Sequence, residues 1–309
     1  MRSALIIAHT VRYEITCLAA DAAQQLRAAG FEVRMLASEA SECRCDAEAT
    51  VVPDEGAAEG AEIVLVFGGD GTFLRASEYA RPAGVPMLGV NLGHVGFLAE
   101  ADPDALSATI KTVVDRRYEV EERTTVDVEV SHRGEVIARS WALNEASVEK
   151  STRERILELA VAVDGRPLLR FGCDGVLCAT PTGSTAYAYS VGGPIVWPTV
   201  DALLVVPNAA HALFARPIVV SPQSVVDVEL LRDDHPGVLA CDGKRSIEIP
   251  PRGSVRVRGG ALPVRIARIH DWSFGERLVT KFQLPVRSFR DGDSTGRDST
   301  GGDDRSDPR

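Results

Sequence analysis

Lysine is scarce in this chain of 309 residues: only four lysines stand among 34 basic residues, and 44 acidic residues leave a formal net charge of −10. Proteins that hold nucleic acid do so mainly with extended basic surfaces, so this charge balance argues against a nucleic-acid partner. Any site for phosphate groups must therefore be local.

Long apolar runs are absent as well. No stretch approaches the ~20 residues that a membrane-spanning helix needs. The run Ala4–Ile7, with Arg2 as its only preceding positive charge, is too short for the core of a signal peptide. The six cysteines include no C-x-x-C pair and no pair at zinc spacing, which fits reduced thiols. We therefore expect a cytoplasmic protein without a membrane partner.

The familiar phosphate-binding signatures are also missing. The sequence contains no G-x-x-x-x-G-K-[ST], no G-x-G-x-x-G and no catalytic loop of the protein-kinase type. If the chain transfers phosphoryl groups, it must use a different phosphate-binding loop.

The order of apolar patterns indicates two domains, as expected for a chain of 309 residues. Residues 1–117 alternate short apolar runs with helical periodicity, which predicts an α/β domain with a parallel sheet. Alternation with period two then predicts an all-β domain over residues 118–270. The moderately apolar segment 271–289 is expected to return to the first domain. The polar residues 290–309 are expected to form a disordered tail.

The first domain is also predicted to contain an irregular connector and a capped helix. Residues 38–60 are rich in Ala, Glu, Ser and Gly without a clear period, which predicts a mobile connector. Asp102, with Pro103 after it, is predicted to cap a helix that ends near residue 115.

The motif Gly68-Gly69-Asp70-Gly71-Thr72 stands between the continuous apolar run Ile63–Phe67 and the start of a helix. Ligands bind at this place in α/β sheets, because glycines let the backbone approach a phosphate and the helix start favours an anion. Asp70 would repel phosphate, so its presence suggests a Mg²⁺ contact or a general base. Spacing alone leaves equally open that Asp70 only caps the helix in a Gly-Asp-Gly turn.

A second cluster follows a predicted strand and reads Thr180-Pro-Thr-Gly-Ser-Thr-Ala-Tyr187. The hydroxyls of Thr182, Ser184 and, further on, Ser190 offer many hydrogen bonds without a basic side chain, which suits recognition of a nucleoside. Composition alone leaves a simple β-turn with Ser/Thr helix capping as the alternative.

Asn144-Glu145 follows the predicted strand Trp141–Leu143 and offers an amide and a carboxylate for a base or a ribose hydroxyl. In isolation the pair is a weak signal, because such pairs are mostly surface residues.

Five motifs in fixed order resemble those of bacterial NAD kinases over about residues 3–285. They are the glycine-rich motif at 68–72, Asn91-Leu-Gly-His-Val-Gly-Phe-Leu98, Asn144-Glu145, the cluster at 180–187, and Cys241-Asp242-Gly243. The stretch Asn208-Ala-Ala-His-Ala-Leu-Phe-Ala-Arg-Pro217 resembles the actinobacterial branch. The resemblance implies an α/β domain related distantly to phosphofructokinases and diacylglycerol kinases, facing a β-domain across a cleft.

The resemblance also implies roles for the donor half of the site. Asp70 would take the proton of the adenosine-ribose 2′-hydroxyl of NAD as that oxygen attacks the γ-phosphorus of ATP, or of polyphosphate. Gly68, Gly69, Gly71 and Thr72 would hold the donor phosphates. A divalent cation, Mg²⁺, is the expected cofactor, with its protein ligands left unassigned, and a homodimer or homotetramer is the expected assembly.

In the acceptor half, the resemblance implies that Asn144 and Glu145 contact the ribose hydroxyls or adenine, and that Phe97 packs on the adenine. Asp174 would hold the ribose or carboxamide on the nicotinamide side. The remaining expected NAD-binding residues lie in the second cluster: Thr182, Ser184, Thr185, Ala186, Tyr187 and Ser190. Asp242 is expected near a domain or subunit interface, without a chemical role.

One stretch departs from the family pattern. Many members carry an arginine shortly before the aspartate that matches Asp174, whereas this chain has Phe171-Gly172-Cys173. Anchoring of the NAD pyrophosphate by that arginine is therefore not expected from this stretch, and an arginine of another subunit could substitute.

Two other interpretations stay open. A lipid or sphingoid-base kinase uses the same kind of glycine-rich loop, although the polar cluster at 180–187 does not suit the apolar funnel that a lipid requires. A regulator that binds NAD without turning it over is disfavoured by an intact Asp70 but not excluded.

Overall fold

The computed structural model describes residues 1–40, 42, 49–90, 96–98, 105–152, 156–269 and 273–286. The chain divides into two compact units, Met1–Asp271 and Trp272–Arg309, and each is described by itself. The predicted tail at 290–309 and the predicted cap at Asp102 lie outside the described residues.

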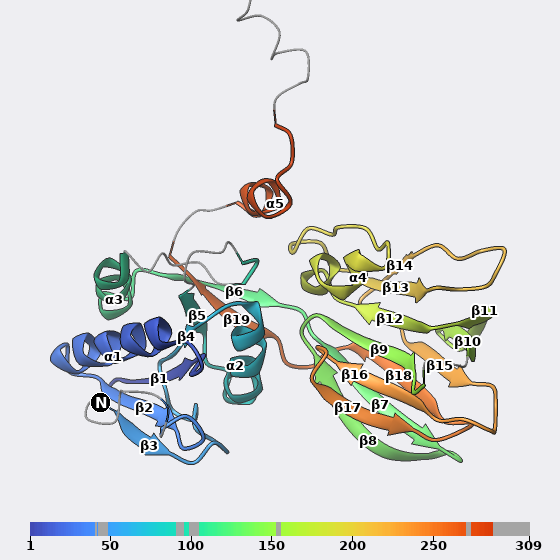
Figure 1. The fold of residues 1–309 in the computed structure, drawn as a ribbon, viewed down its shortest axis with the longest axis horizontal. Helices are drawn as coiled ribbons and strands as arrows, with labels where there is room; N and C mark the ends of the chain where they lie inside the picture. The colour runs from blue at the N-terminus through green and yellow to red at the C-terminus, as the bar shows by residue number, and fades with distance from the viewer. Residues whose placement is uncertain are drawn as a thin grey trace, which may run out of the picture. The chain divides into compact units, whose positions relative to one another are not determined.

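The first unit opens with a seven-stranded sheet in the order β3-β2-β1-β4-β5-β19-β6 (Figure 1). All neighbouring strands are parallel except β6, which runs antiparallel to β19. The strands are β1 (Ser3–Ala8), β2 (Glu32–Leu36), β3 (Thr50–Val52), β4 (Ile63–Phe67), β5 (Met87–Val90), β6 (Glu119–Arg123) and β19 (Val264–Arg268).

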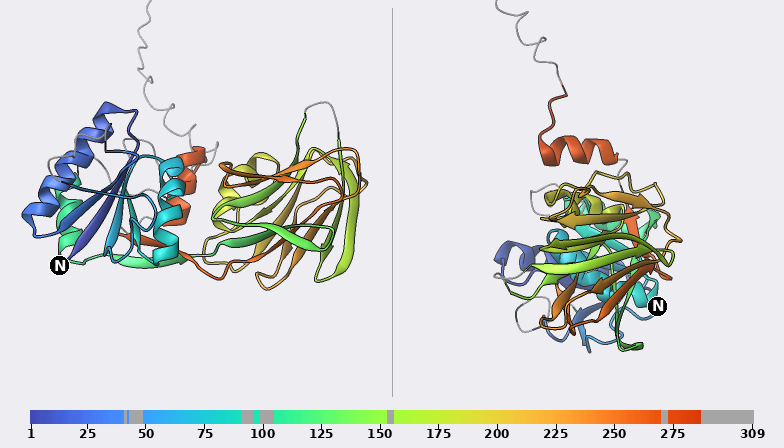
Figure 2. Two further views of the ribbon diagram at one scale, coloured as in Figure 1. Left: turned by 90° about the horizontal axis from the view of Figure 1, so that it is seen from below. Right: turned by 90° about the vertical axis from the view of Figure 1, so that its right-hand side faces the viewer.

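Helices cover both faces of this sheet, as the left view of Figure 2 shows. One core cluster combines Ile6 of β1 with apolar residues of α1 (Tyr13–Ala28) and α3 (Leu106–Val114). A second cluster combines Ile7 of β1 with Phe73 and Ala76 of α2 (Asp70–Ala83). Because both faces are covered, every residue of β1, β4 and β5 is buried, which explains their continuous apolar runs.

The structure differs from the predicted organisation in two places. Both β6 and β19 belong to the first sheet, although they fall inside the segment 118–270 that was expected to be wholly in the β-domain. Alternation with period two does not distinguish a strand at the border of a mixed sheet from one in a β-sandwich. The expected connector at 38–60 contains β3, a three-residue strand that is mostly exposed at the sheet edge and so lacks an apolar signal.

The β-domain consists of two six-stranded antiparallel sheets, in the orders β11-β10-β15-β18-β7-β8 and β14-β13-β12-β9-β16-β17. Its core lies between them and is built from alternating residues such as Val128 and Val228 of one sheet and Val148 and Val176 of the other. The strands of the first sheet are β7 (Val126–His132), β8 (Glu135–Ala142), β10 (Leu157–Val163), β11 (Arg166–Cys173), β15 (Val226–Leu230) and β18 (Ser254–Gly259). Those of the second are β9 (Glu145–Lys150), β12 (Gly175–Ala179), β13 (Leu203–Asn208), β14 (Ile218–Val220), β16 (Gly237–Cys241) and β17 (Arg245–Ile249).

Helix α2 is tied to the β-domain by charged side chains. Arg81, near its C-terminal end, pairs with Asp127 at 3.0 Å, and Glu78 accepts a hydrogen bond from Arg245 at 3.0 Å. The guanidinium groups of Arg81 and Arg245 lie 4.3 and 4.5 Å from the centre of the Trp141 ring. These contacts fix the helix that follows the glycine-rich motif against the strand end that leads to Asn144.

The second unit contributes α5 (Phe274–Phe282). A capping box begins the helix: Ser273 accepts from the Glu276 amide, and the Glu276 carboxylate accepts from the Ser273 amide at 2.8 Å. The expected return of residues 271–289 to the first domain stays a prediction. None of the described helices has the length and apolarity that crossing a membrane requires.

Candidate active site

The glycine-rich motif forms the connection from β4 to α2, at the carboxyl end of a buried parallel strand. Gly68 has φ of +150°, and a Cβ on it would stand 2.5 Å from Thr72 Oγ1, so only glycine fits there. Its amide donates to the Val90 carbonyl of the neighbouring strand at 3.0 Å. Gly68 is therefore explained by the fold alone.

Gly69 and Gly71 are not explained in the same way. A Cβ on either residue would meet nothing within 4 Å, and neither has a positive φ. No described neighbour demands that these positions lack a side chain. The bare backbone instead leaves room for an outside group beside the N-terminus of α2, where amides and the helix dipole favour an anion.

The carboxylate of Asp70 points to the 96–98 segment. The amides of Phe97 and Leu98 donate to its two oxygens at 3.3 and 3.2 Å. A Cβ on Gly96 would fall 2.5 Å from Asp70 Oδ1, so that glycine makes room for the carboxylate. The N-cap residue of α2 is Gly69, which has no side chain to cap the helix, so the bonds from Phe97 and Leu98 orient the Asp70 carboxylate and do not cap the helix.

Leu143 and Asn144 form the tight connection between β8 and β9, Glu145 begins β9, and Asp242 holds the connection. Both carboxylate oxygens of Asp242 accept hydrogen bonds from backbone amides, from that of Asn144 at 2.7 Å and from that of Leu143 at 3.0 Å. The Asp242 amide in turn donates to the Glu145 carbonyl at 3.0 Å. Asp242 is 7% exposed and also pairs with Arg245 at 2.7 Å.

Glu145 is buried with one carboxylate oxygen that lacks a hydrogen-bond partner among the described residues. The residue is 5% exposed, and the oxygen concerned is Oε2. Burial, followed by the charge of Asp242, raises the pKa of Glu145 to about 8, although the Tyr187 amide donates to its carboxylate. An orphaned buried carboxyl oxygen costs free energy, so it suggests a hydroxyl or amine partner that arrives with a ligand.

The turn at 180–187 packs directly on Asn144. Thr180 Oγ1 donates to the Leu143 carbonyl at 2.6 Å and accepts from the Gly183 amide at 3.1 Å. A Cβ on Gly183 would stand 2.0 Å from the Asn144 carbonyl oxygen, so only glycine permits this approach. The turn continues as a 3₁₀ segment, η2 (Thr182–Thr185), and as α4 (Tyr187–Ser190).

The predicted NAD-binding residues of this turn fall into two groups. Ser184 is fully buried and its hydroxyl is used inside the protein, donating to the Pro181 carbonyl at 2.6 Å and accepting from the Val196 amide at 2.9 Å. The structure therefore gives Ser184 a supporting position, which differs from the predicted contact with NAD. Thr182 is also buried, at 8% exposed. The second group can be reached from outside: Thr185, Ala186 and Tyr187 are half-buried, and Ser190 is exposed.

Asp174 lies between β11 and β12, where Lys150 Nζ pairs with its Oδ1 at 2.6 Å. On the neighbouring strand β13, the Asn208 carbonyl accepts a hydrogen bond from the Asp174 amide at 3.1 Å, and the Asn208 side chain donates to the Tyr187 hydroxyl at 3.1 Å. Asp174, Lys150 and Tyr187 thus come together from three separate elements at one end of the β14-β13-β12-β9-β16-β17 sheet.

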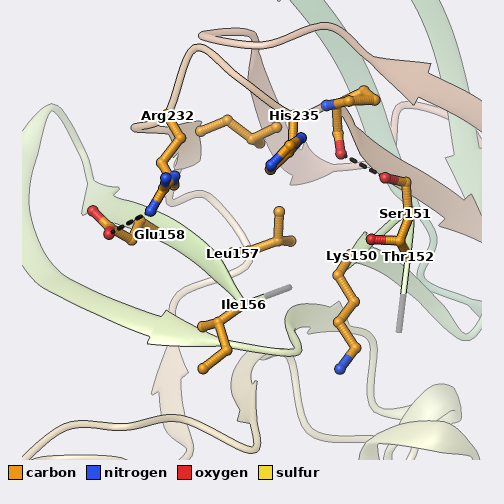
Figure 3. Close-up of a pocket in the computed structure, with 10 residues that line it drawn as sticks. Lys150, Ser151, Thr152, Ile156, Leu157, Glu158, Arg232 and His235 are labelled. Atoms are coloured by element: carbon orange, nitrogen blue, oxygen red, sulfur yellow. Dashed lines mark hydrogen bonds and ion pairs between the residues drawn. The ribbon is translucent and has the colours of Figure 1, made fainter. Parts of the chain in front are cut away.

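Two cavities open on the side of the β-domain next to Asp174. The smaller, of about 20 Å³, is drawn in Figure 3, where Arg232 pairs with Glu158 at 3.4 Å and Lys150 extends away from both. The larger, of about 850 Å³, is lined by Ile156, Glu158, Arg170, Phe171, Gly172, His211, Arg232 and His235. Phe171 and Gly172, from the stretch that departs from the family pattern, line this larger cavity together with Arg170.

The glycine-rich loop and the Asn144 turn are joined by one short segment. Between β16 and β17, Asp242 binds the amides at 143 and 144, while Lys244 Nζ donates to the Gly71 carbonyl at 2.8 Å. From the sequence, Asp242 had no predicted chemical role, and Lys244 was not among the predicted site residues. The available signals were the Cys241-Asp242-Gly243 motif and the rarity of lysine.

Comparison with known proteins identifies the family. A family model described as "ATP-NAD kinase N-terminal domain" matches residues 5–118, and one described as "ATP-NAD kinase C-terminal domain" matches residues 143–269. NAD kinase 2 of Streptomyces coelicolor is 52% identical over 292 residues, which cover 94% of this chain and 97% of that protein. The chain belongs to the NAD kinase family.

Other relatives agree with this assignment. The NAD kinase of Thermobifida fusca is 53% identical over 307 residues, covering 96% of this chain and 94% of that protein. An Archaeoglobus fulgidus NAD kinase solved in complex with ATP has a TM-score of 0.66 at 27% identity, covering 86% and 93% of the two chains. Yeast NADH kinase complexed with NADH shares the fold, with a TM-score of 0.85 at 21% identity over 93% and 89% of the chains.

This family membership decides among the three interpretations of the sequence. The chain is an enzyme with NAD kinase activity, which transfers a phosphoryl group to NAD. The lipid-kinase and non-catalytic interpretations receive no support from these relatives. The described residues contain no group of three or more His, Cys, Asp or Glu side chains placed to hold a metal ion.

Proposed function

We propose that this NAD kinase performs its reaction between the glycine-rich loop and the Asn144–Glu145 turn, with Asp70 as the general base. The 2′-hydroxyl oxygen of the adenosine ribose of NAD forms a bond to the γ-phosphorus of ATP while the bond from that phosphorus to the β-phosphate oxygen breaks. ADP departs with the bond's electron pair, and the hydroxyl proton passes to the Asp70 carboxylate. The products are NADP and ADP.

One observation carries this proposal: the segment 242–244 contacts both halves of the site. Asp242 positions the Asn144 amide at 2.7 Å, and Lys244 reaches the Gly71 carbonyl at 2.8 Å. Asp70 and Glu145 each stand next to one of these anchored residues in sequence. Phosphoryl transfer depends mainly on holding acceptor and donor in line, so a segment that fixes both halves is what the reaction requires.

For the donor, we propose that the phosphates approach the bare backbone at Gly69 and Gly71, with Gly68 and Thr72 shaping the loop. ATP is the donor that the complex of the Archaeoglobus fulgidus relative supports. Polyphosphate presents the same chain of phosphate groups and stays a second candidate.

For the acceptor, we propose that Glu145 and Asn144 bind ribose hydroxyls or the adenine, because Glu145 Oε2 is buried without a partner. Phe97, next to the carboxylate of Asp70, would pack on the adenine. Asp174 would face the nicotinamide-side ribose or carboxamide, beside the larger cavity. Adenine and nicotinamide would also contact the partly exposed members of the 180–187 turn, namely Thr185, Ala186 and Tyr187, with Ser190 at its edge and the largely buried Thr182 beside them.

Mg²⁺ fits this site as an ion that is held largely by the donor. It prefers one or two carboxylates together with substrate phosphates and waters, and Asp70 is the single carboxylate in the loop. Mg²⁺ would supply charge neutralisation of the phosphate oxygens. Asp70 would be its protein ligand. The amides of Phe97 and Leu98 already hold the Asp70 carboxylate in its orientation.

We further propose a cytoplasmic enzyme that assembles as a homodimer or homotetramer, with an α/β domain of the phosphofructokinase and diacylglycerol-kinase kind. Buried free thiols at Cys173, Cys178 and Cys241 support a reducing compartment. The exposed side chains of Leu213 and Phe214 support an apolar contact between copies. Sedimentation velocity on the purified chain tests the assembly.

A product assay tests the chemistry. The purified enzyme receives Mg²⁺ with either ATP or polyphosphate, and NAD, NADH or diacylglycerol as acceptor. We expect NADP from NAD with ATP, and ³¹P NMR should place the new phosphate on the 2′-oxygen of the adenosine ribose. A 3′-phosphate would rule out the proposed placement of the ribose.

A further inference from the structure

We infer that Lys244, delivered from the turn between β16 and β17, binds the phosphates of the donor at the glycine-rich loop. This inference rests on the proposed placement of the donor at that loop. The observation behind it is the bond from Lys244 Nζ to the Gly71 carbonyl oxygen, 2.8 Å long, between residues 173 positions apart.

The ammonium group keeps donors for an incoming anion. A lysine ammonium carries three N–H donors, and the bond to Gly71 uses one of them. No second hydrogen-bond acceptor for Lys244 occurs among the described residues. Both Lys244 and Gly71 are exposed, so a phosphate that reaches the open side of Gly71 can also reach Nζ.

The neighbouring arginines are already paired, which distinguishes Lys244 from them. Arg75 forms an ion pair with the buried Glu39 and donates to the Ala8 carbonyl. Arg245 pairs with Glu78 and with Asp242. The positive charge at Lys244 is the one in this group without a carboxylate bound to it.

The electrostatic surroundings of Lys244 favour an anion. Partial burial lowers its pKa first, repulsion from Arg75 and Arg245 lowers it further, and Glu78 and Asp242 act against these effects. A phosphate oxygen placed beside the ammonium would relieve the repulsion. The Lys244 ammonium would also offset the negative charge of Asp70, which otherwise opposes a phosphate at this loop.

A purely structural role predicts something different. An exposed lysine on an exposed carbonyl contributes little to folding stability. If the bond only joined the two domains, removing it would disturb NAD and ATP binding alike, because the same turn holds Asn144 through Asp242.

The test compares Lys244→Met with Lys244→Arg and with Lys111→Met. Lys111 is an exposed lysine on α3, so it controls for the loss of one surface charge. We expect Lys244→Met to raise the KM for ATP about 10- to 100-fold, the effect of losing a charge-assisted hydrogen bond. The KM for NAD and the melting temperature should stay near those of the wild type. Lys244→Arg should raise the KM for ATP less than Lys244→Met does, and Lys111→Met should leave the KM for ATP unchanged.

Gly71→Ala, assayed in parallel, separates this inference from the proposed function. A raised KM for ATP in Gly71→Ala together with an unchanged one in Lys244→Met overturns the role of Lys244 alone. An unchanged KM for ATP in Gly71→Ala means that the loop is not the donor site, and both proposals then fail. Equal increases in the KM for ATP and in the KM for NAD in Lys244→Met would show a purely structural bond and overturn the inference.

Discussion

Asp242 accepts a hydrogen bond from the backbone amide of Asn144 at 2.7 Å, across 98 positions of sequence. The contact joins two connections of the β-domain, one that carries the candidate ribose-binding residues and one that carries Lys244. The buried carboxylate binds the Leu143 and Asn144 amides and Arg245 and does not face an open surface, so Asp242 is a positioning residue for the acceptor half of the site.

Removing the charge of Asp242 should therefore harm both folding and NAD binding. In Asp242→Asn the side-chain NH₂ group would face a backbone amide or Arg245, and at least one buried bond is lost. We expect about 2–4 kcal/mol less stability by chemical denaturation, and a larger increase in the KM for NAD than in that for ATP. Asp227→Asn, which breaks a surface pair with Arg256, should change stability by less than about 0.5 kcal/mol. Equal losses of stability in Asp242→Asn and Asp227→Asn would contradict the positioning role of Asp242.

Glu145 predicts a pH dependence of stability. Its pKa is about 8 in the folded chain, against 4.5 for an unperturbed glutamate, so between these values the folded state holds a proton that the unfolded state has lost. The free energy of unfolding therefore falls as pH rises. The stabilisation that comes from keeping Glu145 protonated is fully present below pH about 4.5 and is lost once the pH passes about 8.

Denaturation of the wild type and of Glu145→Gln across this pH range measures the effect. Gln has nearly the same shape and does not titrate, so the difference in stability between the two proteins should shift in favour of the variant by on the order of 1–4 kcal/mol. Parallel curves for the two proteins would mean that Glu145 titrates normally. The variant should also bind NAD less tightly, which isothermal titration calorimetry can measure.

Two glycines of the same loop should respond in opposite ways to alanine. Gly68→Ala places a Cβ 2.5 Å from Thr72 Oγ1 at a φ of +150°, so we expect a loss of about 2 kcal/mol or more in stability. Gly71→Ala adds a methyl group in open space, so its stability should match the wild type while its KM for ATP rises. Thermal denaturation and initial rates on both variants provide the comparison. A destabilised Gly71→Ala would show that the fold, not a ligand, requires this glycine.

Local patterns were sufficient to predict much of the fold and several parts of the site. The short apolar runs within residues 1–117 predicted a parallel sheet, because strands covered on both faces are apolar throughout, as β1, β4 and β5 are. The glycine-rich motif was correctly placed between a strand and a helix. What local patterns cannot show is pairing between distant segments: β19 enters the first sheet from residue 264, and Lys244 reaches Gly71 across 173 positions. The burial of Ser184 was equally hidden, since a hydroxyl that braces a turn has the same composition as one that faces a ligand.

Asp70 carries the most direct prediction about catalysis. Asp70→Asn keeps an oxygen that can accept the amides of Phe97 or Leu98, so the loop and NAD binding should change little. The amide cannot take the proton of the 2′-hydroxyl, and loss of a positioned base typically costs ~10²–10⁴-fold in rate. We expect kcat to fall by two orders of magnitude or more with a modest change in the KM for NAD, as measured by initial rates of NADP formation. Asp115→Asn, at the end of α3, is the control for a surface aspartate. If turnover in Asp70→Asn stays nearly intact in a folded protein, the carboxylate only orients the 96–98 segment or touches the metal, and the base lies elsewhere.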